Sequence, residues 1–335
     1  MTPERPIKFA VAGLGRIGER HVRQAVRIDG FELTAVCDTS KEVRKKFAAA
    51  VDFEGFKTFD DYRKMLDAGL ADVAVIATPS HLHYEMTLAA LDAGCNVLVE
   101  KPMAADGKQA KEMLAAAEKA GRFLTIHQSV RYQPDTQMIK QVVDSGVLGQ
   151  VFQVYSAQHN FNERKDWQIW RKFNGGAVSN VGVHHLDAAM LMVEGEPETV
   201  FAGFHRILDH GDADDCFKIV VRYNAGQIVE AEILRSYFPK ALWHICGTRG
   251  SAWIDDTLPE ITMHVKTLDD KEWSQDYNFH NDGGNVPLYY DDLADKLLRG
   301  EAPPVTPQSV IRQLQVIDAA RKSNQTKQSQ PVDLS

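Results

Sequence analysis

Residues 7–18 of the chain read IKFAVAGLGRIG, an apolar run followed by glycines spaced as G-x-G-x-x-G. The apolar run predicts a short strand over 7–12, and the pattern after it predicts a helix to about residue 28. Gly13 allows a tight turn, Gly15 lets a ligand approach the backbone, and Gly18 lets the helix pack closely on the strand. In this strand–turn–helix context the motif predicts a dinucleotide-binding loop.

The helix that follows these glycines supplies the next part of the predicted site. Its N-terminus offers backbone N–H groups and a positive dipole end, so we expect the backbone at Arg16 and Ile17 to hold a pyrophosphate. Asp38 ends the second predicted strand, where its carboxylate can accept hydrogen bonds from ribose hydroxyls. That carboxylate would repel a 2′-phosphate, which favours NAD over NADP. Lys41 and Arg44 lie close by in the sequence and leave NADP as an alternative.

The first third of the chain alternates strand and helix patterns. Further strands are predicted over 31–37, 72–77, 96–99 and 123–126, and helices over 41–50, 60–68, 84–93 and 106–120. Alternation at this spacing predicts a parallel, doubly wound Rossmann sheet of the α/β class.

The pattern changes after residue 127, where strand-like runs follow one another. Strands are predicted over 151–160, 200–207, 216–223 and 228–236, and helices over 136–144, 183–193, 288–298 and 308–321. This order predicts an α+β domain with an open, mostly antiparallel sheet. We therefore expect an NAD-binding domain over 1–127 and a substrate-binding and oligomerisation domain over 128–335. The tail from Ser323, rich in Gln, Ser and Lys, is expected to be loosely ordered at its end.

Composition narrows the class of protein. The chain has 335 residues, 44% of them hydrophobic and 25% charged, which is typical of a soluble globular protein. A net charge of −8 argues against nucleic acid or an anionic membrane as a partner. The polar N-terminus lacks the design of a signal peptide, and no apolar run approaches the ~20 residues of a membrane span. We therefore expect a cytoplasmic protein without membrane contact.

Two further segments extend the predicted site. ATPSHLH, residues 77–83, follows the strand predicted over 72–77, and Glu-Lys-Pro, residues 100–102, follows the strand predicted over 96–99. Both should lie along the carboxyl edge of the sheet, where ligands bind in this architecture.

With the glycine loop, these segments resemble the Gfo/Idh/MocA family (glucose–fructose oxidoreductase, inositol dehydrogenase and rhizopine catabolism proteins). The resemblance continues through GGA at 175–177, VGVH at 181–184, ICGTRG at 245–250 and the helix around 305–321.

The resemblance implies NAD(P)-dependent oxidation or reduction at a hydroxyl or ketone of a sugar, cyclitol or related compound. It implies that Lys101 sits beside the nicotinamide and the substrate, and that His184 is the second catalytic residue. It also implies a homodimer or homotetramer, because the open sheet of this family commonly pairs between subunits. The cofactor-binding residues carried over by motif from the two further segments are Thr78, Pro79, His83, Glu100 and Lys101.

The chemistry of alcohol oxidation independently supports a proton-transfer role for a lysine or a histidine. Removing a hydride from carbon must be matched by removing the hydroxyl proton, so a base must lie within hydrogen-bond reach. Histidine suits this near neutral pH, and a lysine that is desolvated or close to a positive ring can also serve. A protonated lysine would instead polarise the carbonyl in the reverse reaction. Which of Lys101 and His184 holds the mobile proton stays open.

Asn180 departs from the family pattern. Many members carry an aspartate at this position, four residues before the histidine. Four residues apart at the start of a helix, Asn180 and His184 can share a face. An amide can hold a substrate hydroxyl, but it cannot relay a proton as a carboxylate can. We therefore assign Asn180 to the catalytic site without a proton-transfer role, and Asp187 is either a partner of His184 or a structural carboxylate.

Other polar and aromatic residues are candidates for substrate contact. The predicted substrate-binding residues are Lys101, Gln128, Arg131, Trp167, Trp170, Asn180 and His184. The two tryptophans could stack on the C–H faces of a sugar, with core or subunit packing as the equal alternative. His81 and His83, and the adjacent His184 and His185, do not have convincing metal-ligand spacing, so we expect no metal. Tyr289 and Tyr290 resemble a family position near the active site, but we expect them to pack at a helix start.

The leading interpretation is an NAD-dependent dehydrogenase whose partner is a small sugar or polyol. Two alternatives use the same scaffold. One is a glycoside-cleaving or epimerising enzyme that keeps NAD bound through a transient redox cycle. The other is a non-catalytic, dinucleotide-sensing regulator, which the presence of both Lys101 and His184 disfavours.

Overall fold

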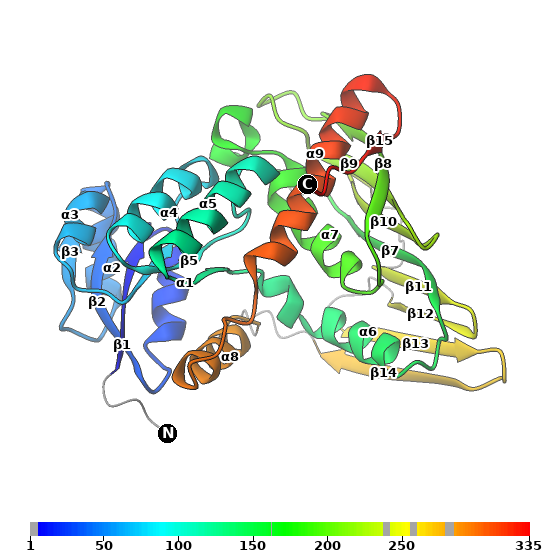
Figure 1. The fold of residues 1–335 in the computed structure, drawn as a ribbon, viewed down its shortest axis with the longest axis horizontal. Helices are drawn as coiled ribbons and strands as arrows, with labels where there is room; N and C mark the ends of the chain where they lie inside the picture. The colour runs from blue at the N-terminus through cyan, green and yellow to red at the C-terminus, as the bar shows by residue number, and fades with distance from the viewer. Residues whose placement is uncertain (1–5, 162, 237–241, 255–259, 279–284) are drawn as a thin grey trace. The chain divides into compact units, whose positions relative to one another are not determined.

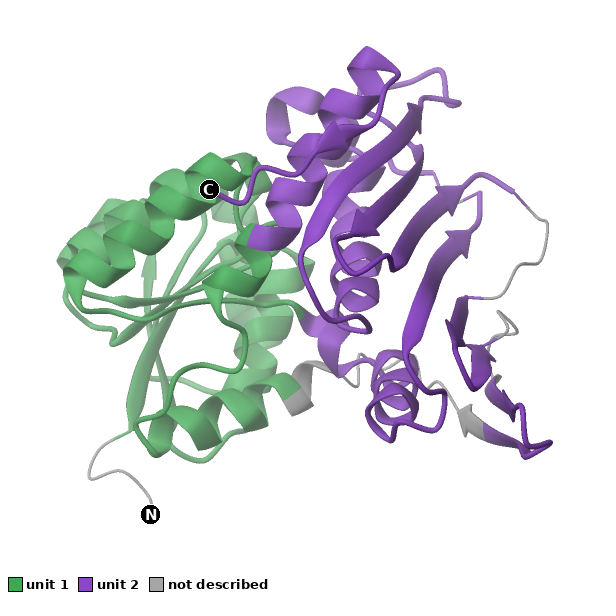
Figure 2. Cartoon of the chain, turned by 45° about the vertical axis from the view of Figure 1, so that its right-hand side comes forward, with its two compact units in different colours: residues 1–128, 286–311 green, residues 129–285, 312–335 purple. Residues whose placement is uncertain are grey.

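The computed structural model describes residues 6–161, 163–236, 242–254, 260–278 and 285–335. The chain forms two compact units, coloured separately in Figure 2. The first comprises Met1–Gln128 and Val286–Ile311, and the second comprises Ser129–Asn285 and Arg312–Ser335. The segment Val286–Ile311, which the sequence alone grouped with the second half, therefore packs with the first unit. It does so because it carries aromatic side chains that contact the first unit's buried histidines.

The first unit is built on a parallel sheet with the strand order β3-β2-β1-β4-β5-β6. Its strands are β1 (Ile7–Ala12), β2 (Phe31–Cys37), β3 (Lys57–Phe59), β4 (Val73–Ile76), β5 (Asn96–Val99) and β6 (Leu124–Ile126). The central strand β4 is buried along its whole length, as expected for a parallel sheet covered on both faces.

Helices connect these strands (Figure 1). They are α1 (Arg16–Ala25), α2 (Lys41–Ala50), α3 (Tyr62–Asp67), α4 (His83–Asp92) and α5 (Gly107–Ala120), with α8 (Asn285–Leu298) added from the distant segment. Side-chain caps begin three of them: the side chains of Ser40, Asp61 and Asp106 accept backbone N–H groups of the first turns. The predicted α/β alternation is confirmed.

The order of the strands fixes where the predicted site forms. From β1 the chain moves one way through β2 to β3, then returns to β4 on the other side of β1 and continues to β6. Neighbouring strands wound in opposite directions leave a crevice at their carboxyl ends. The glycine loop, residues 77–83 and residues 100–102 follow β1, β4 and β5, so all three come to this one edge.

The second unit is built on a sheet whose described strands have the order β14-β13-β12-β11-β7-β10-β9-β8-β15. These strands are β7 (Val151–His159), β8 (Pro197–His205), β9 (Cys216–Tyr223), β10 (Ile228–Leu234), β11 (Trp243–Gly247), β12 (Gly250–Ile254), β13 (Glu260–Thr267), β14 (Glu272–Asn278) and β15 (Gln330–Pro331). All described pairs are antiparallel except β7 with β10, so the predicted mostly antiparallel sheet is confirmed.

Helices α6 (Pro134–Asp144) and α7 (Val183–Met190) belong to this unit, and α9 (Pro307–Thr326) runs from the first unit into it. Helix α7 packs on β7 and β10. Within the described ranges, no helix combines the length and the apolar character needed to cross a bilayer.

The expectation of a loosely ordered tail from Ser323 is wrong. Helix α9 continues to Thr326, and β15 pairs with β8 at the edge of the sheet. The buried Ser323 accepts the backbone N–H of Ala202 through its hydroxyl at 3.0 Å. The polar side chains of Ser323, Asn324 and Ser329 hydrogen-bond to the backbone of β8 instead.

The glycine loop approaches the turn after β4 too closely for a side chain. Gly13 has a φ of +87°, and a Cβ atom there would lie 2.5 Å from the carbonyl oxygen of Ala77. A Cβ atom on Gly18 would lie 1.7 Å from the carbonyl oxygen of Gly13. Both obstacles are backbone atoms, which cannot rotate away.

We expect Gly13→Ala to lower the free energy of unfolding by at least about 1–2 kcal/mol, because alanine is strained at this φ, and Gly18→Ala to lower it more. Gly15→Ala is the matched control, since its Cβ would meet no heavy atom within 4 Å. Chemical denaturation of the three variants tests this. A Gly18→Ala protein as stable as Gly15→Ala would contradict the packing described here.

Candidate active site

The N-terminus of α1 has the features of an anion-binding site. Gly15 is the N-cap residue of this ten-residue helix, and no side chain caps it. A Cβ atom built on Gly15 would meet nothing within 4 Å, so the space in front of the first helical N–H groups is clear. Arg16 and Ile17 form the first turn. Free N–H groups, a helix dipole and an unobstructed approach are what a pyrophosphate needs, so these residues fit a dinucleotide.

Asp38 lies directly after β2 and is tied to this loop. Its Oδ2 accepts the backbone N–H of Leu14 at 2.9 Å, and its Oδ1 accepts the N–H of Ser40 at 2.8 Å. The carboxylate is therefore held beside the glycine loop by two backbone donors. Arg44 donates from Nη1 to the carbonyl oxygen of Asp38 at 2.5 Å, which brings a guanidinium group to the same turn.

His83 joins the two loops that follow β4 and β5. Its buried ring directs Nδ1 to the carbonyl oxygen of Pro102 at 2.7 Å and Nε2 to the carbonyl oxygen of Thr78 at 2.9 Å. Burial lowers the pKa of His83, which favours the neutral ring, and a neutral ring donates only one of these two bonds. Pro79, the residue after Thr78, is the N-cap of a short 3₁₀ turn over Ser80–Leu82.

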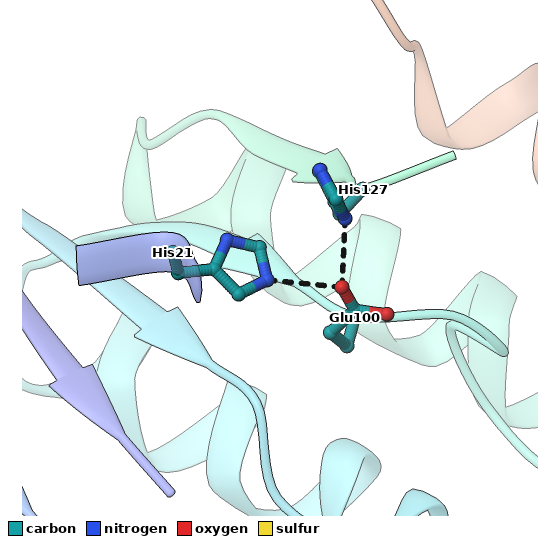
Figure 3. A group of neighbouring side chains, drawn as sticks. All are labelled: His21, Glu100 and His127. Atoms are coloured by element: carbon teal, nitrogen blue, oxygen red, sulfur yellow. Dashed lines mark hydrogen bonds and ion pairs between the residues drawn. The ribbon is translucent and has the colours of Figure 1, made fainter. Parts of the chain in front are cut away.

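Glu100 is the centre of a buried hydrogen-bonded cluster, shown in Figure 3. Its Oε1 lies 2.9 Å from Nε2 of His21 and 2.7 Å from Nδ1 of His127. Its Oε2 accepts the backbone N–H of Lys101 at 3.1 Å. Burial raises the pKa of the Glu100 carboxyl, but the His127 charge and the hydrogen bonds from both histidines outweigh it and hold the pKa well below 4.5. The carboxylate is therefore ionised at neutral pH.

These three side chains also have the composition of a metal site. One ligand atom from each lies within 4.8 Å of the others, and all three residues are buried. The two N···O separations are hydrogen-bond lengths, however, and they share one carboxylate oxygen. Hydrogen bonding accounts for the geometry without a cation.

In the second unit, Asn180 lies in a π-helical turn over Val178–Gly182 that leads into α7. With its amide oxygen facing Arg164, Asn180 accepts from Nε at 2.8 Å, and its nitrogen donates to Oε1 of Gln168 at 2.8 Å. Arg164 also donates from Nη1 to Asp166 at 3.0 Å. A carboxylate at position 180 would form a second ion pair with this guanidinium, whereas the amide gives a hydrogen bond without charge.

This part of the second unit contains a partly open pocket of about 250 Å³. Its polar lining includes Asn160, Arg164, Gln168, Asn180, His210 and Asp214. Burial raises the pKa of the Asp214 carboxyl, although the backbone N–H of Val178 is hydrogen-bonded to its Oδ2 at 2.9 Å. A small pocket lined by amides and charged groups offers both donors and acceptors to a hydroxylated ligand.

The remaining predicted contact residues are distributed over both units. Partly buried Lys101 and fully buried Gln128 belong to the first unit, and partly buried His184, in the first turn of α7, belongs to the second. Trp167 begins a 3₁₀ turn of the second unit, and Trp170 beyond it is 41% exposed. Their contacts with substrate stay predictions.

Arg131 and Asp187 form an ion pair in the second unit. Nε and Nη2 of Arg131 lie 2.8 and 2.7 Å from the two oxygens of Asp187, so the fork is engaged by a buried carboxylate. This pairing favours the structural alternative for Asp187 over a partnership with His184. The substrate-binding role of Arg131 stays a prediction.

Comparison with known proteins defines the family. The model of an oxidoreductase family with an NAD-binding Rossmann fold, Gfo/Idh/MocA, matches residues 7–128. The model of that family's C-terminal alpha/beta domain matches residues 140–334. The chain belongs to the Gfo/Idh/MocA oxidoreductase family. Its cofactor domain is thus an NAD-binding Rossmann domain, as the sequence predicts.

Named relatives act on sugars and inositols. The D-glucoside 3-dehydrogenase of Escherichia coli is 32% identical over 63% of this chain, and that match spans only 60% of the E. coli protein. The NADP⁺-dependent scyllo-inositol 2-dehydrogenase IolW of Bacillus subtilis is 22% identical, over 96% of this chain and 95% of its own length.

A solved structure resembles this chain along nearly all of its length. The WlbA dehydrogenase of Bordetella pertussis, in complex with NADH and UDP-GlcNAcA, superposes with a TM-score of 0.83 and 25% identity. The superposition covers 99% of this chain and all of that one.

Several residues of the two candidate sites could not be assigned from the sequence. In this Gfo/Idh/MocA protein, His21 and His127 bond to Glu100, the Tyr290 hydroxyl bonds to His21, and Arg164 and Gln168 bond to Asn180. One signal was available for His21, because it lies on the same face of α1 as the buried Gly18, Val22 and Ala25. A polar ring on an apolar helix face requires a buried partner.

The ionisation of Glu100 predicts a pH-dependent contribution to stability. We expect Glu100→Gln to lower the free energy of unfolding by about 2 kcal/mol at pH 7, because an ionised acceptor is lost from a buried cluster. A carboxyl group whose pKa is lowered by folding stabilises the protein above the unfolded value of 4.5 and loses this effect as the pH falls below it. The penalty should therefore shrink at acidic pH.

Denaturant titrations at pH 7 and pH 4 measure this, with the exposed Glu118→Gln as the control. A penalty that is the same at both pH values, or that grows on acidification, would show that Glu100 is not held ionised.

Proposed function

We propose that this protein transfers a hydride between NAD and a secondary hydroxyl or ketone of a sugar, cyclitol or sugar derivative. The observation that carries the proposal is the position of Glu100-Lys101-Pro102 at the carboxyl end of β5, on the edge where the glycine loop also lies. This edge is where a doubly wound sheet binds its dinucleotide, so the lysine belongs to the cofactor's end of the unit.

The substrate class rests on relatives and on the second unit's pocket. The named relatives are a glucoside dehydrogenase and inositol dehydrogenases. The pocket lined by Arg164, Gln168 and Asn180 presents donors and acceptors that suit several hydroxyl groups on one small ring. We propose that the substrate's polar face is held there.

Proton transfer is assigned to Lys101 and His184, which act on the substrate oxygen. Bound NAD supplies the hydride acceptor, and its reduced form the donor. In oxidation, one of these two side chains takes the hydroxyl proton as the C–H bond breaks. In reduction, the same group returns the proton to the alkoxide. Asn180 orients the substrate through its amide, which cannot carry a proton.

The cofactor contacts are assigned within the first unit. The α1 N-terminus at Gly15 to Gly18 holds the pyrophosphate, and Asp38 accepts hydrogen bonds from the adenosine ribose hydroxyls. The Thr78–His83 loop and Glu100 border the nicotinamide ribose. The buried His83 supports this assignment, because it binds carbonyl groups of both loops and keeps their spacing fixed.

We further propose that the protein assembles as a homodimer or homotetramer through the sheet of the second unit. Large apolar side chains on its strands are solvent-exposed: Phe152 on β7 at 47% and Phe201 on β8 at 52%. Large apolar side chains left exposed on a sheet can be covered by a second subunit.

Replacing Lys101 tests the central role. We expect Lys101→Ala to lower kcat at least about a hundredfold, because a positioned proton-transfer group is lost, while NAD still binds. Lys108→Ala, at an exposed position of α5, should behave as wild type. The assay follows NADH absorbance with a panel of sugars, inositols and sugar acids.

Near-wild-type turnover by Lys101→Ala would refute the mechanism. Steady NADH release by the wild type identifies a dehydrogenase, whereas turnover without added NAD identifies the glycoside-cleaving or epimerising alternative. An inert protein that binds NAD tightly identifies the regulator.

Asp38 is tested through cofactor preference. Asp38→Asn keeps an acceptor for the Leu14 N–H but removes the charge that repels a 2′-phosphate. We expect the ratio of the NADP Kd to the NAD Kd to fall about tenfold. The exposed Asp29→Asn makes the same change in net charge elsewhere and should leave the ratio unchanged. Equal ratios in the two variants would contradict the ribose assignment.

A further inference from the structure

The Glu100 carboxylate divides its hydrogen bonds between two sets of partners. Its Oε1 faces the ring nitrogens of His21 and His127, and its Oε2 accepts the backbone N–H of Lys101 (Figure 3 draws the first set). The buried histidines therefore hydrogen-bond to one carboxylate oxygen, and the backbone N–H of Lys101 hydrogen-bonds to the other.

The hydrogen bonds to Glu100 fix the position of one hydrogen on each imidazole ring. An ionised carboxylate only accepts, so Nε2 of His21 and Nδ1 of His127 must both carry hydrogen. Burial lowers the pKa of His21, which keeps that ring singly protonated and makes its Nδ1 an acceptor. The Tyr290 hydroxyl lies 2.6 Å from this Nδ1 and must be the donor. The chain of donors thus runs from Tyr290 through His21 to Glu100.

Together with His127, the members of this chain come from four separate parts of the first unit. His21 lies on α1, Glu100 follows β5, His127 follows β6, and Tyr290 lies on α8. Each residue is at most 8% exposed, so bulk water cannot replace a lost hydrogen-bond partner. In such a site an acceptor without a donor is costly. Loss of the Tyr290 hydroxyl would leave Nδ1 of His21 buried without its donor and would loosen the ring that holds Glu100.

We propose that Tyr290 is a positioning residue for Lys101, acting through His21 and Glu100 to fix the backbone from which the lysine side chain extends. His127 is the second support of the same carboxylate oxygen. This inference rests on the proposed function of Lys101, because positioning matters only if that lysine meets the substrate.

The adjacent tyrosine provides a matched control. Tyr289 and Tyr290 are both buried, but the Tyr289 hydroxyl lies 3.3 Å from Oγ1 of Thr125 and 3.4 Å from the carbonyl oxygen of Ile126. Tyr290→Phe and Tyr289→Phe each remove one buried hydroxyl from α8. Only the first removes the donor to His21.

The experiment measures hydrogen exchange of the Lys101 amide and steady-state kinetics in the full-length chain. In Tyr290→Phe we expect the Lys101 amide to exchange about tenfold faster, and kcat to fall about tenfold with KM and the NAD Kd unchanged, as for a misplaced reacting group. In Tyr289→Phe both should stay at wild-type values. Equal effects in the two variants, or a Tyr290→Phe protein with wild-type exchange or wild-type kcat, would overturn the proposal.

The exchange arm separates this inference from the proposed function. If the wild type oxidises no member of the substrate panel, the proposed function fails, and the role of Tyr290 in catalysis falls with it. The hydrogen-bond chain is still tested by exchange of the Lys101 amide. Should Tyr290→Phe not fold, ¹⁵N NMR of histidine-labelled wild type decides: we expect hydrogen on Nε2 of His21 and on Nδ1 of His127. The opposite tautomer of His21 overturns the chain of donors.

Discussion

The first unit depends on the contact between backbone atoms of the glycine loop and the turn after β4. Where Gly13 meets Ala77, and where Gly18 meets Gly13, no side chain fits. This contact closes the β1–α1 turn against the neighbouring strand and leaves the N-terminus of α1 open in front of Gly15. A cofactor seat made of backbone N–H groups needs no charged side chain, and its shape is fixed by the sheet itself.

Around this seat, side chains connect loops that the sheet alone would leave independent. Asp38 ties the second strand to the glycine loop, and His83 ties the loop after β4 to the one after β5. Glu100 connects buried histidines to the backbone of Lys101. Loss of the buried His83 or Glu100 would leave buried polar partners unsatisfied, so these ties hold the loops at a fixed spacing.

Local sequence predicted most strands of the first unit and the glycine turn because each depends on residues close together in the chain, whereas the short β3 and the strands from β11 to β14 were not predicted. The cluster around Glu100 could not be predicted in this way, since it joins positions 21, 100, 127 and 290. The same applies to Ser323, whose hydroxyl bonds to a strand more than a hundred residues away. Asp187 illustrates a middle case: its alternatives were recognised, but only the fold shows that Arg131 engages it. The resemblance to the family identified Lys101 and His184 as candidates, and their roles remain proposals.

The central claim is that a hydride passes between the substrate carbon and NAD. It is tested most directly by a single turnover with sugars and inositols deuterated at carbon, followed by mass spectrometry of the reduced cofactor. We expect deuterium to appear in the NADH in one step, with no hydrogen derived from solvent. Reduced cofactor without deuterium, or substrate conversion that never reduces NAD, would contradict it.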